Sequence, residues 1–438
     1  NTFNIKDADG LTLGANAAGV SGVPYNGLIR RDSGDEVPRN STEGLFTATV
    51  MSSGAFSATC TIDGTMLTCA GAFDPNGVAR FGTSQATTCA LARANKPSLI
   101  VSFTIDVSSF RTKDTISGHV ISSSFANTNS ADSTFTADRA YYDGLTPATT
   151  VPSDYLGAAG ATQAYTLRLP PSGPTDPAFY PQGNGYGFLT ITKAGVVTLT
   201  SGKLADGTPI TGSSRLSKDK MFPLFLQLYN KLGFARGDVM LDSTQHESDM
   251  SSPGVDWLRP LDTTSQYFPY GWGEDPDFTP RPSGLLTVGL EGARYVTSFA
   301  PAGSVLLQGD GSDVDFVGDP LPPVDPLNGN ATLVFSLGQL SDLVFRFLNV
   351  TTTNVITNAP TSDTSFTLAF DVPSGKFSGK FVHENDEGAA SPPMTDFEGA
   401  LYQKGIGAGG SGFFLTRKPN PIDYLGQSGG VFLDGGLP

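Results

Sequence analysis

The sequence is poor in the residues that build most active sites and most nucleic-acid interfaces. It has three histidines and three cysteines in 438 residues, and charged residues make up 16% of the chain. The 42 acidic residues outnumber the 27 basic ones, which leaves a formal net charge of −15. Nucleic-acid binding depends on clustered Lys and Arg that displace counterions, so this composition argues against a nucleic-acid partner.

Catalytic motifs and long apolar runs are also lacking. The chain has no GxSxG nucleophile elbow, no HExxH zinc motif and no phosphate-binding P-loop. Residues 407–412 match the letters of the dinucleotide fingerprint, but a strand-like segment follows where that site needs a helix. No run of eighteen apolar residues occurs, so we expect no transmembrane segment. We therefore predict a protein that is not an enzyme.

Strand formers and turn residues, in contrast, are abundant. The chain contains 52 glycines and 31 prolines. Between Leu99 and Ile105, apolar and polar residues alternate, which is typical of a strand with one face on the core and the other in water. No segment of comparable length has a helical period. The predicted fold class is all-β.

One hairpin pattern occurs three times. In each copy an alternating strand meets a small residue followed by glycine and then returns as a second strand. The copies are residues 45–58, 188–199 and 366–379. The turn glycines are Gly54, Gly195 and Gly375, and such a turn needs the positive φ that glycine adopts readily. The repeat predicts that the chain contains copies of one β unit.

We expect two antiparallel β-barrel or β-sandwich domains with long loops and extended termini. A stretch rich in Pro and Thr around Pro147 predicts a linker between them. The expected parts are an N-terminal extended segment (1–20), a first β domain (21–145), the linker (146–161), a larger second β domain with loop insertions (162–417) and a C-terminal tail (418–438).

Two of the three cysteines lie in one predicted hairpin. If residues 64–65 form its two-residue turn, Cys60 lies opposite Cys69 and the two can form a disulfide. If residues 63–64 form the turn instead, the register shifts and Cys60 no longer faces Cys69. We predict the Cys60–Cys69 disulfide, with Cys89 left as a free thiol or as the partner of another chain.

An acidic loop offers ligands for a hard cation. Asp310, Asp313 and Asp315 are spaced so that one flexible turn can direct several carboxylate oxygens at Ca²⁺, which takes six to eight oxygen ligands. The flanking sequence does not complete a helix-flanked calcium loop, so a solvated turn is the alternative. Calcium is the one metal that the sequence suggests, and no other cofactor is expected.

A second loop combines aromatic rings with carboxylates. Tyr270, Trp272, Glu274 and Asp275 lie within six residues, and sugar-binding sites use this pairing to stack on a sugar ring and hydrogen-bond its hydroxyls. The sequence therefore offers a carbohydrate site here. The alternative is that the aromatic rings fold back onto the β domain.

Short segments distributed along the chain carry a resemblance to a known family. They are residues 25–28, 135–142, 185–187, 204–208, 228–233, 257–260 and 397–415. In these turns and core positions the chain resembles a family of secreted, β-rich surface proteins of Verrucomicrobia-type bacteria. The resemblance implies fold and export and carries no catalytic residues. Members of this family often end very large extracellular chains of repeats, which implies an adhesive or structural role.

We therefore expect a secreted structural or adhesive protein of the cell surface whose signal peptide has been removed. Its expected partners are copies of itself or other envelope proteins. Residues 2–13 and 430–433 lie outside the repeats, and each is a hypothetical donor strand for a neighbour's sheet in a filament or envelope layer. The alternatives are an extracellular carbohydrate-binding module, with glycans as partners, and an extracellular polysaccharide-acting hydrolase.

Overall fold

The computed structural model describes residues 4–6, 12–16, 19–31, 39–108, 114–122, 132–172, 176–272, 285–297, 325–351, 353–384, 392–405, 408–416 and 426–434. Over these residues the regular structure is antiparallel β-sheet with a few short 3-10 helices, and the all-β prediction is confirmed. In this part of the chain no helix has the length and apolar character needed to cross a membrane. The strands form three sheets, which define the first, middle and third units.

The first unit is a nine-stranded sheet in the order β5-β4-β3-β2-β1-β9-β8-β7-β6. Its strands are β1 (Val23–Arg31), β2 (Gly44–Val50), β3 (Ala55–Ile62), β4 (Thr65–Phe73), β5 (Ala79–Phe81), β6 (Cys89–Arg93), β7 (Lys96–Ile105), β8 (Thr115–Ser122) and β9 (Asp132–Arg139). A bridge between Val78, just before the edge strand β5, and Thr104 of β7 connects the two ends of the sheet, so the unit is a nearly closed barrel.

The middle unit is a ten-stranded sheet in which β10 and β19 pair at the centre. Its strands are β10 (Gln163–Leu169), β11 (Gly185–Ile191), β12 (Val196–Lys203), β13 (Gly212–Arg215), β14 (Met221–Leu228), β15 (Gly233–Leu241), β16 (Met250–Ser251), β17 (Val255–Leu258), β18 (Leu286–Val288) and β19 (Glu291–Arg294). Pro223 lies in β14, which pairs only with β15, and an edge strand tolerates the missing N–H of proline.

The third unit is an eight-stranded sheet in the order β22-β21-β20-β27-β26-β25-β24-β23. Its strands are β20 (Ala331–Leu337), β21 (Val344–Val350), β22 (Ile356–Asn358), β23 (Phe366–Asp371), β24 (Lys376–Val382), β25 (Met394–Tyr402), β26 (Gly409–Leu415) and β27 (Ser428–Asp434). The side-chain amide of Asn358 on β22 donates to the Phe366 carbonyl on β23 at 3.0 Å, so this sheet also nearly closes.

All three units follow one rule of topology: the first strand of each pairs with its last. These pairs are β1 with β9, β10 with β19 and β20 with β27. The three predicted hairpins lie within these sheets as β2–β3, β11–β12 and β23–β24, and φ is 81° at Gly54, 67° at Gly195 and 78° at Gly375. The internal repeat therefore marks three β units rather than two.

Phenylalanine opposite glycine is a recurring pair in the two barrels. Examples in the first unit are Gly27 with Phe46 and Gly118 with Phe135, and in the third unit Gly379 lies opposite Phe397. A Cβ added at Gly379 would come within 2.5 Å of the Phe397 ring, so the glycine leaves the space that the ring occupies. Such alternation of small and large side chains fills the interior of a small barrel.

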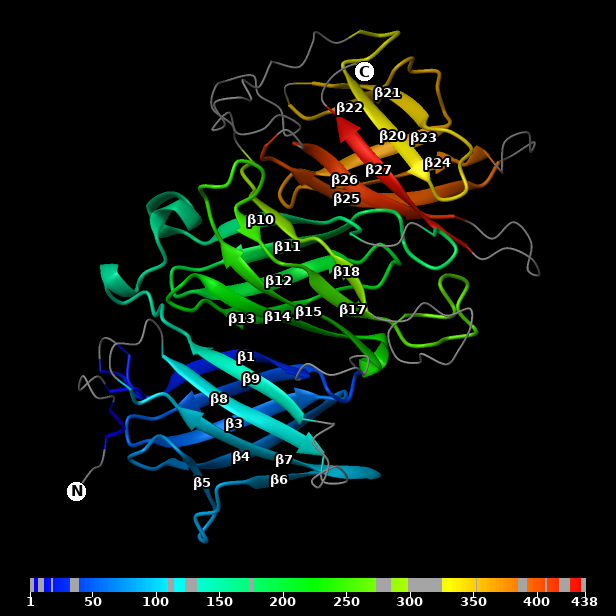
Figure 1. Cartoon of the computed structure of the whole chain (residues 1–438). Helices are drawn as coiled ribbons and strands as arrows, with labels where there is room; N and C mark the ends of the chain where they lie inside the picture. The colour runs from blue at the N-terminus through cyan, green and yellow to red at the C-terminus, as the bar shows by residue number, and fades with distance from the viewer. Residues whose placement is uncertain are drawn as a thin grey trace.

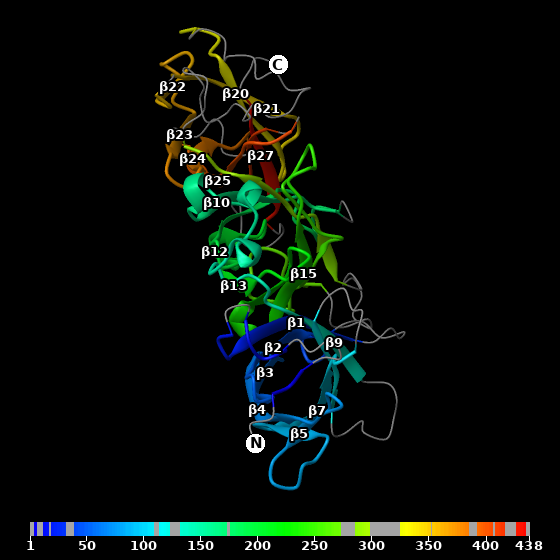
Figure 2. The ribbon, with the colours of Figure 1, turned by 90° about the vertical axis from the view of Figure 1, so that its left-hand side faces the viewer.

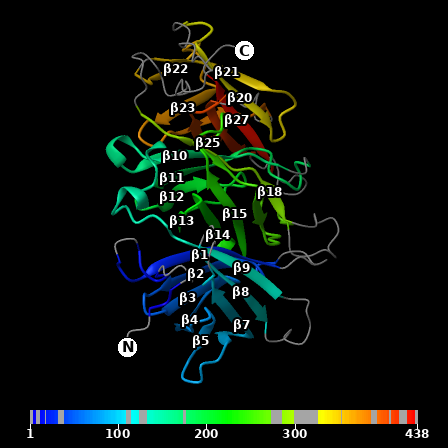
Figure 3. The same cartoon turned by 60° about the vertical axis from the view of Figure 1, so that its left-hand side comes forward.

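The three units lie one after another along the long axis of the molecule (Figure 1, Figure 2). The middle unit, drawn in green, separates the first unit, in blue and cyan, from the third, in yellow to red, and Figure 3 shows the same order from another side. The single larger domain expected over residues 162–417 is thus divided into two sheets.

The expected linker over 146–161 is part of the middle unit. It forms three 3-10 turns, Pro147–Thr149, Ser153–Tyr155 and Ala158–Gly160. Val151 and Tyr155 are buried in the middle core, and the Tyr165 hydroxyl donates to the Tyr155 carbonyl at 3.1 Å. A stretch rich in Pro and Thr is typical of packed turns as well as of linkers. The burial of Val151 and Tyr155 shows that this stretch consists of packed turns.

Both terminal segments belong to their own units. Ile5 and Leu13 are buried in the first core, and the Ile5 amide donates to the Ser52 carbonyl. Residues 430–433, expected in a tail, lie within β27, which pairs with β20 on one side and β26 on the other. Both edges of β27 are therefore occupied within the chain, and donation of residues 430–433 to a neighbour stays a prediction that would require β27 to leave this sheet.

Candidate functional site: the two junctions between units

The aromatic loop expected to bind sugar folds into the middle unit. Trp272 is 0% exposed, and its ring lies perpendicular to that of Trp257 with the ring centres 4.7 Å apart. Tyr270 is half-buried, and its ring centre lies 6.0 Å from that of Phe179. Glu274 and Asp275 lie outside the described residues. Trp272 cannot stack on a sugar from this position, because burial of its large apolar surface places the ring in the core.

A buried arginine organises the backbone of this loop. The Arg259 guanidinium contacts the Asp206 carboxylate and donates to the carbonyls of Tyr267 at 2.8 Å and Phe268 at 3.2 Å. The Tyr229 hydroxyl donates to Asp206 at 2.6 Å. This network satisfies the loop carbonyls with a charged donor, whose five N–H groups suit that task.

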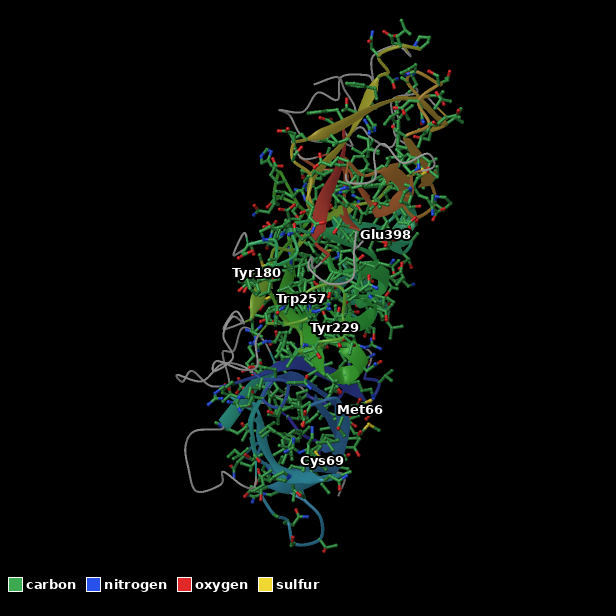
Figure 4. All side chains as sticks on the ribbon, turned by 90° about the vertical axis from the view of Figure 1, so that its right-hand side faces the viewer. Met66, Cys69, Tyr180, Tyr229, Trp257 and Glu398 are labelled. Atoms are coloured by element: carbon green, nitrogen blue, oxygen red, sulfur yellow. The ribbon has the colours of Figure 1, made fainter. Side chains whose placement is uncertain are left out.

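Trp257 completes the network, because its indole N–H donates to the Tyr229 hydroxyl at 2.9 Å. Tyr229 and Trp257 lie close together at the centre of the middle unit in Figure 4. Burial raises the pKa of Tyr229 well above its usual value, and the Asp206 carboxylate adds to the rise, so the phenol stays protonated. Asp206, Tyr229, Trp257 and Arg259 all lie in segments that carried the family resemblance, and the fold brings them together.

The organised loop reaches the third unit. The Tyr267 hydroxyl donates to the Thr416 carbonyl at 2.9 Å, and the Gly426 amide donates to the Gln266 carbonyl at 3.0 Å. These contacts form part of the junction between the middle and third units, which we call the second junction. Arg259 thus acts on that junction through the loop that it holds.

Glu398 on β25 is the charged centre of the second junction (Figure 4). Its carboxylate accepts hydrogen bonds from the Tyr186 hydroxyl at 2.8 Å and from Lys203, both of the middle unit, and lies 3.0 Å from the ammonium of Lys376. Burial raises the pKa of Glu398, but the three donors outweigh burial and leave that pKa below its usual value. The Glu398 carboxylate is therefore ionised, and its charge is compensated by the two lysines and the Tyr186 hydroxyl.

Apolar packing adds to these polar contacts at the second junction. Tyr186, Phe188 and Ala205 of the middle unit form a buried cluster with Ala400 and Phe413 of the third. Beyond this cluster, Tyr295 follows β19 and inserts into the core of the third unit, where it is 4% exposed. The hydroxyl of Tyr295 donates to the Val372 carbonyl. Side chains of the middle unit are thus buried against side chains of the third unit, as within a single hydrophobic core.

The junction between the first and middle units, called the first junction, has a different centre. Glu43, which precedes β2, is fully buried and forms an ion pair with Arg236 on β15. Glu43 Oε1 accepts from the Arg31 amide at 3.2 Å, whereas Oε2 makes no hydrogen bond. Burial raises the pKa of Glu43 to about 7, and the charge of Arg236 only partly opposes this rise.

Other contacts at the first junction are polar and more exposed. Arg30 pairs with Asp238 at 2.9 Å, and the side-chain amide of Asn40 donates to the Lys231 carbonyl at 3.0 Å. A cleft of about 670 Å³ lies beside them, between the first unit and the segments around Leu232 and Leu261. Among the described residues, none of the buried hydrophobic clusters spans this junction.

The predicted Cys60–Cys69 disulfide is wrong. The hairpin turns at residues 63–64, where φ is 52° at Asp63 and 69° at Gly64, so Cys60 lies opposite Leu67 and both cysteines are free thiols. An Asp-Gly pair with positive φ at both positions is the preferred two-residue hairpin turn. This pair in the sequence favoured the turn at residues 63–64, in which Cys60 faces Leu67. Tertiary contacts reinforce it, because Asp63 pairs with Arg93 and Lys96.

The predicted calcium ligands Asp310, Asp313 and Asp315 lie outside the described residues. Within the part of the chain that the structure describes, no group of three His, Cys, Asp or Glu side chains is arranged to hold a metal ion. The residues that the fold does bring together are those of the two junctions, and sequence reasoning missed Glu43, Arg236 and Glu398. Nothing in their own segments marks these three residues, because each is an ordinary strand or turn residue there. Only their contacts in the folded chain identify them.

Comparison with known proteins adds no relative: no family model matches the chain, and no curated protein matches it.

Proposed function

We propose that this protein is an exported structural or adhesive component of a cell surface, in which the three units act together as a stiff spacer. The observation that carries the proposal is the end-to-end order of three β units joined by buried contacts. A spacer needs its units held at constant angles, and ion pairs with a shared apolar cluster provide that restraint. The two units at the second junction bury side chains in each other, as obligate partners do.

The topology suits such a role. Because the first and last strands of each unit are antiparallel neighbours, the chain enters and leaves each sheet at adjacent positions: Tyr25 pairs with Arg139, Tyr165 with Arg294 and Thr332 with Asp434. A unit of this kind can be placed in series without a long crossing connection. The acidic surface favours solubility and resists non-specific association.

Two measurements test the proposal together. Immunogold electron microscopy of the source cells asks where the protein is, and we expect label on the outer surface. Small-angle scattering of the purified chain asks whether it is stiff, and we expect a single elongated particle whose length does not vary between low and high salt. Label confined to the cell interior would contradict the proposed location. A distribution of particle lengths that depends on salt would contradict the proposed spacer function.

A further inference from the structure

Three cysteines from different strands meet inside the first barrel. Cys60 on β3 and Cys69 on β4 are buried in the first core, and Cys89 at the start of β6 is partly buried against it. Cys69 pairs in register with Ala58, and Cys89 pairs with Val101. Cross-strand partners point to the same face of a sheet, and Ala58 and Val101 are both buried inside, so both thiols point inward.

Cys69 and Cys89 lie on opposite sides of the seam of the barrel. β5 and β6 are the edge strands of the sheet, and β4 and β6 contact each other across the gap without forming a ladder. The two thiols lie close enough to influence each other's ionisation. Cys60, in contrast, lies diagonal to Cys69, a position at which Cα atoms are about 7–8 Å apart, beyond the range that suits a disulfide.

We propose that Cys69 and Cys89 form a disulfide that closes the seam of the first barrel when the protein meets an external disulfide. The bond would join β4 to β6 covalently, where the Val78–Thr104 bridge, the ion pairs of Asp63 with Arg93 and Lys96, and side-chain packing now connect the two sides. It would enclose β5 and the turn that follows it. This inference stands apart from the proposed spacer function, because it concerns the closure of one unit.

The reaction is a thiol–disulfide exchange with an external disulfide such as oxidised glutathione. Cys89 is the most exposed of the three thiols, so its thiolate attacks one glutathione sulfur, and one reduced glutathione leaves. The Cys69 thiol then loses its proton, its sulfur attacks that of Cys89, and the second reduced glutathione leaves. Two protein thiols are oxidised and one glutathione disulfide is reduced, so atoms and electrons balance.

The surroundings of the two sulfurs support this order of attack. Burial raises the pKa of Cys69 to about 12, and the neighbouring Cys89 adds to the rise. Burial also raises the pKa of Cys89, but the neighbouring Cys69 thiol partly lowers it. Cys89 therefore ionises first, and exchange begins from a thiolate. The reaction should be faster at pH 9 than at pH 7.

Peptide mapping tests the connection. The chain is first fully reduced, then incubated with oxidised glutathione, blocked with an alkylating reagent and digested without reduction. We expect one linked pair of peptides containing Cys69 and Cys89, in the wild type and in a Cys60→Ala variant. Cys89→Ala should give none. A Cys60–Cys69 link, or three alkylated thiols after prolonged incubation, would overturn the proposal.

Thermal unfolding gives a second readout that does not depend on mapping. Closing the seam should raise the Tm of the first unit on the order of 10 °C in wild type and in Cys60→Ala. Cys89→Ala should show the same Tm with and without oxidised glutathione. Since Cys89 is only partly buried, this variant should fold, and its reduced Tm compared with that of the reduced wild type checks that it does. An equal rise in Cys89→Ala would exclude a bond to Cys89.

Discussion

Glu43 at the first junction is fully buried and Glu398 at the second is partly buried, and their pKa values shift in opposite directions. Glu43 has one guanidinium beside it and one backbone hydrogen bond, and burial raises its pKa to about 7. Glu398 is also desolvated, but two ammonium groups and a phenol contact it and leave its pKa below the usual value. The difference lies in the number of donors each carboxylate contacts.

This contrast shows how two junctions in one chain can differ in stiffness. The second junction combines a satisfied carboxylate with a shared apolar cluster, and apolar contacts are not screened by salt. The first junction depends on ion pairs, one of which is buried without full hydrogen bonding. We therefore expect the first junction to be the less stable of the two and to weaken as pH rises through the pKa of Glu43.

The largest effect should follow from removal of Arg259, which holds the loop at the second junction. Arg259→Met leaves the buried Asp206 carboxylate without its cation, and breaking a buried ion pair of this kind costs about 3–5 kcal/mol. Urea unfolding followed by Trp fluorescence measures the loss. Arg80→Met, which breaks the more exposed pair with Asp74 in the first unit, is the control and should leave the Trp transition of the middle unit unchanged. Equal losses in the two variants would refute the special role of Arg259.

Glu398→Gln should be next in size, because it removes the charge that two lysines and Tyr186 contact. We expect a loss of about 2–3 kcal/mol at pH 7 in the unfolding of the third unit, measured by calorimetry. Since the pKa of Glu398 is lowered on folding, its contribution is present above about pH 4.5 and is lost as pH falls through the folded pKa. The difference from wild type should therefore shrink at low pH.

Asp396→Asn is a matched control for Glu398→Gln. Asp396 lies on the same strand, but its side chain is 79% exposed and pairs with Lys380 at 3.0 Å. An exposed pair contributes little, so this variant should change stability by less than about 0.5 kcal/mol at any pH. A loss as large as that of Glu398→Gln would mean that neither variant reports on the junction.

Glu43→Gln should change the pH dependence of stability in the direction opposite to that of Glu398→Gln. Folding raises the pKa of Glu43 from 4.5 to about 7, so the favourable contribution of its proton is full below pH 4.5 and lost as pH rises through 7. The wild-type first junction should weaken on the order of 2 kcal/mol between pH 5 and 8, whereas the variant should not. Hydrogen exchange of the β1 and β14 amides across this range measures the effect, and identical profiles would contradict it.

The smallest effect should come from the exposed pair between Arg30 and Asp238. Their side chains are 44% and 37% exposed, so Arg30→Gln should cost no more than about 1 kcal/mol, and 1 M salt should remove the difference. The same hydrogen-exchange experiment at two salt concentrations measures it. A loss of stability that persists at high salt would show that Arg30 supports the junction through packing of the aliphatic part of its side chain rather than through its charge.

Much of the sheet structure could be predicted from local pattern. The alternation from Leu99 to Ile105 places the apolar residues on the core face of β7, and the three glycine turns mark real hairpins. β27 could not be predicted in the same way, because its Gly429 and Gly430 contribute no apolar period. At Gly429 the glycine is required because Phe414 of β26 lies opposite, and a Cβ there would come within 2.2 Å of the Phe414 ring.

The sequence by itself determined that this chain forms antiparallel sheet, because period-two patterning and positive-φ turns act within a few residues of each other. Only the tertiary structure decided that there are three units, that Trp272 is core, and that Glu43 and Glu398 differ in pKa. Each of those outcomes depends on groups far apart in the chain: Glu43 meets Arg236, and Glu398 meets Lys203. Burial and charge pairing act through space, so no local pattern of residues contains them.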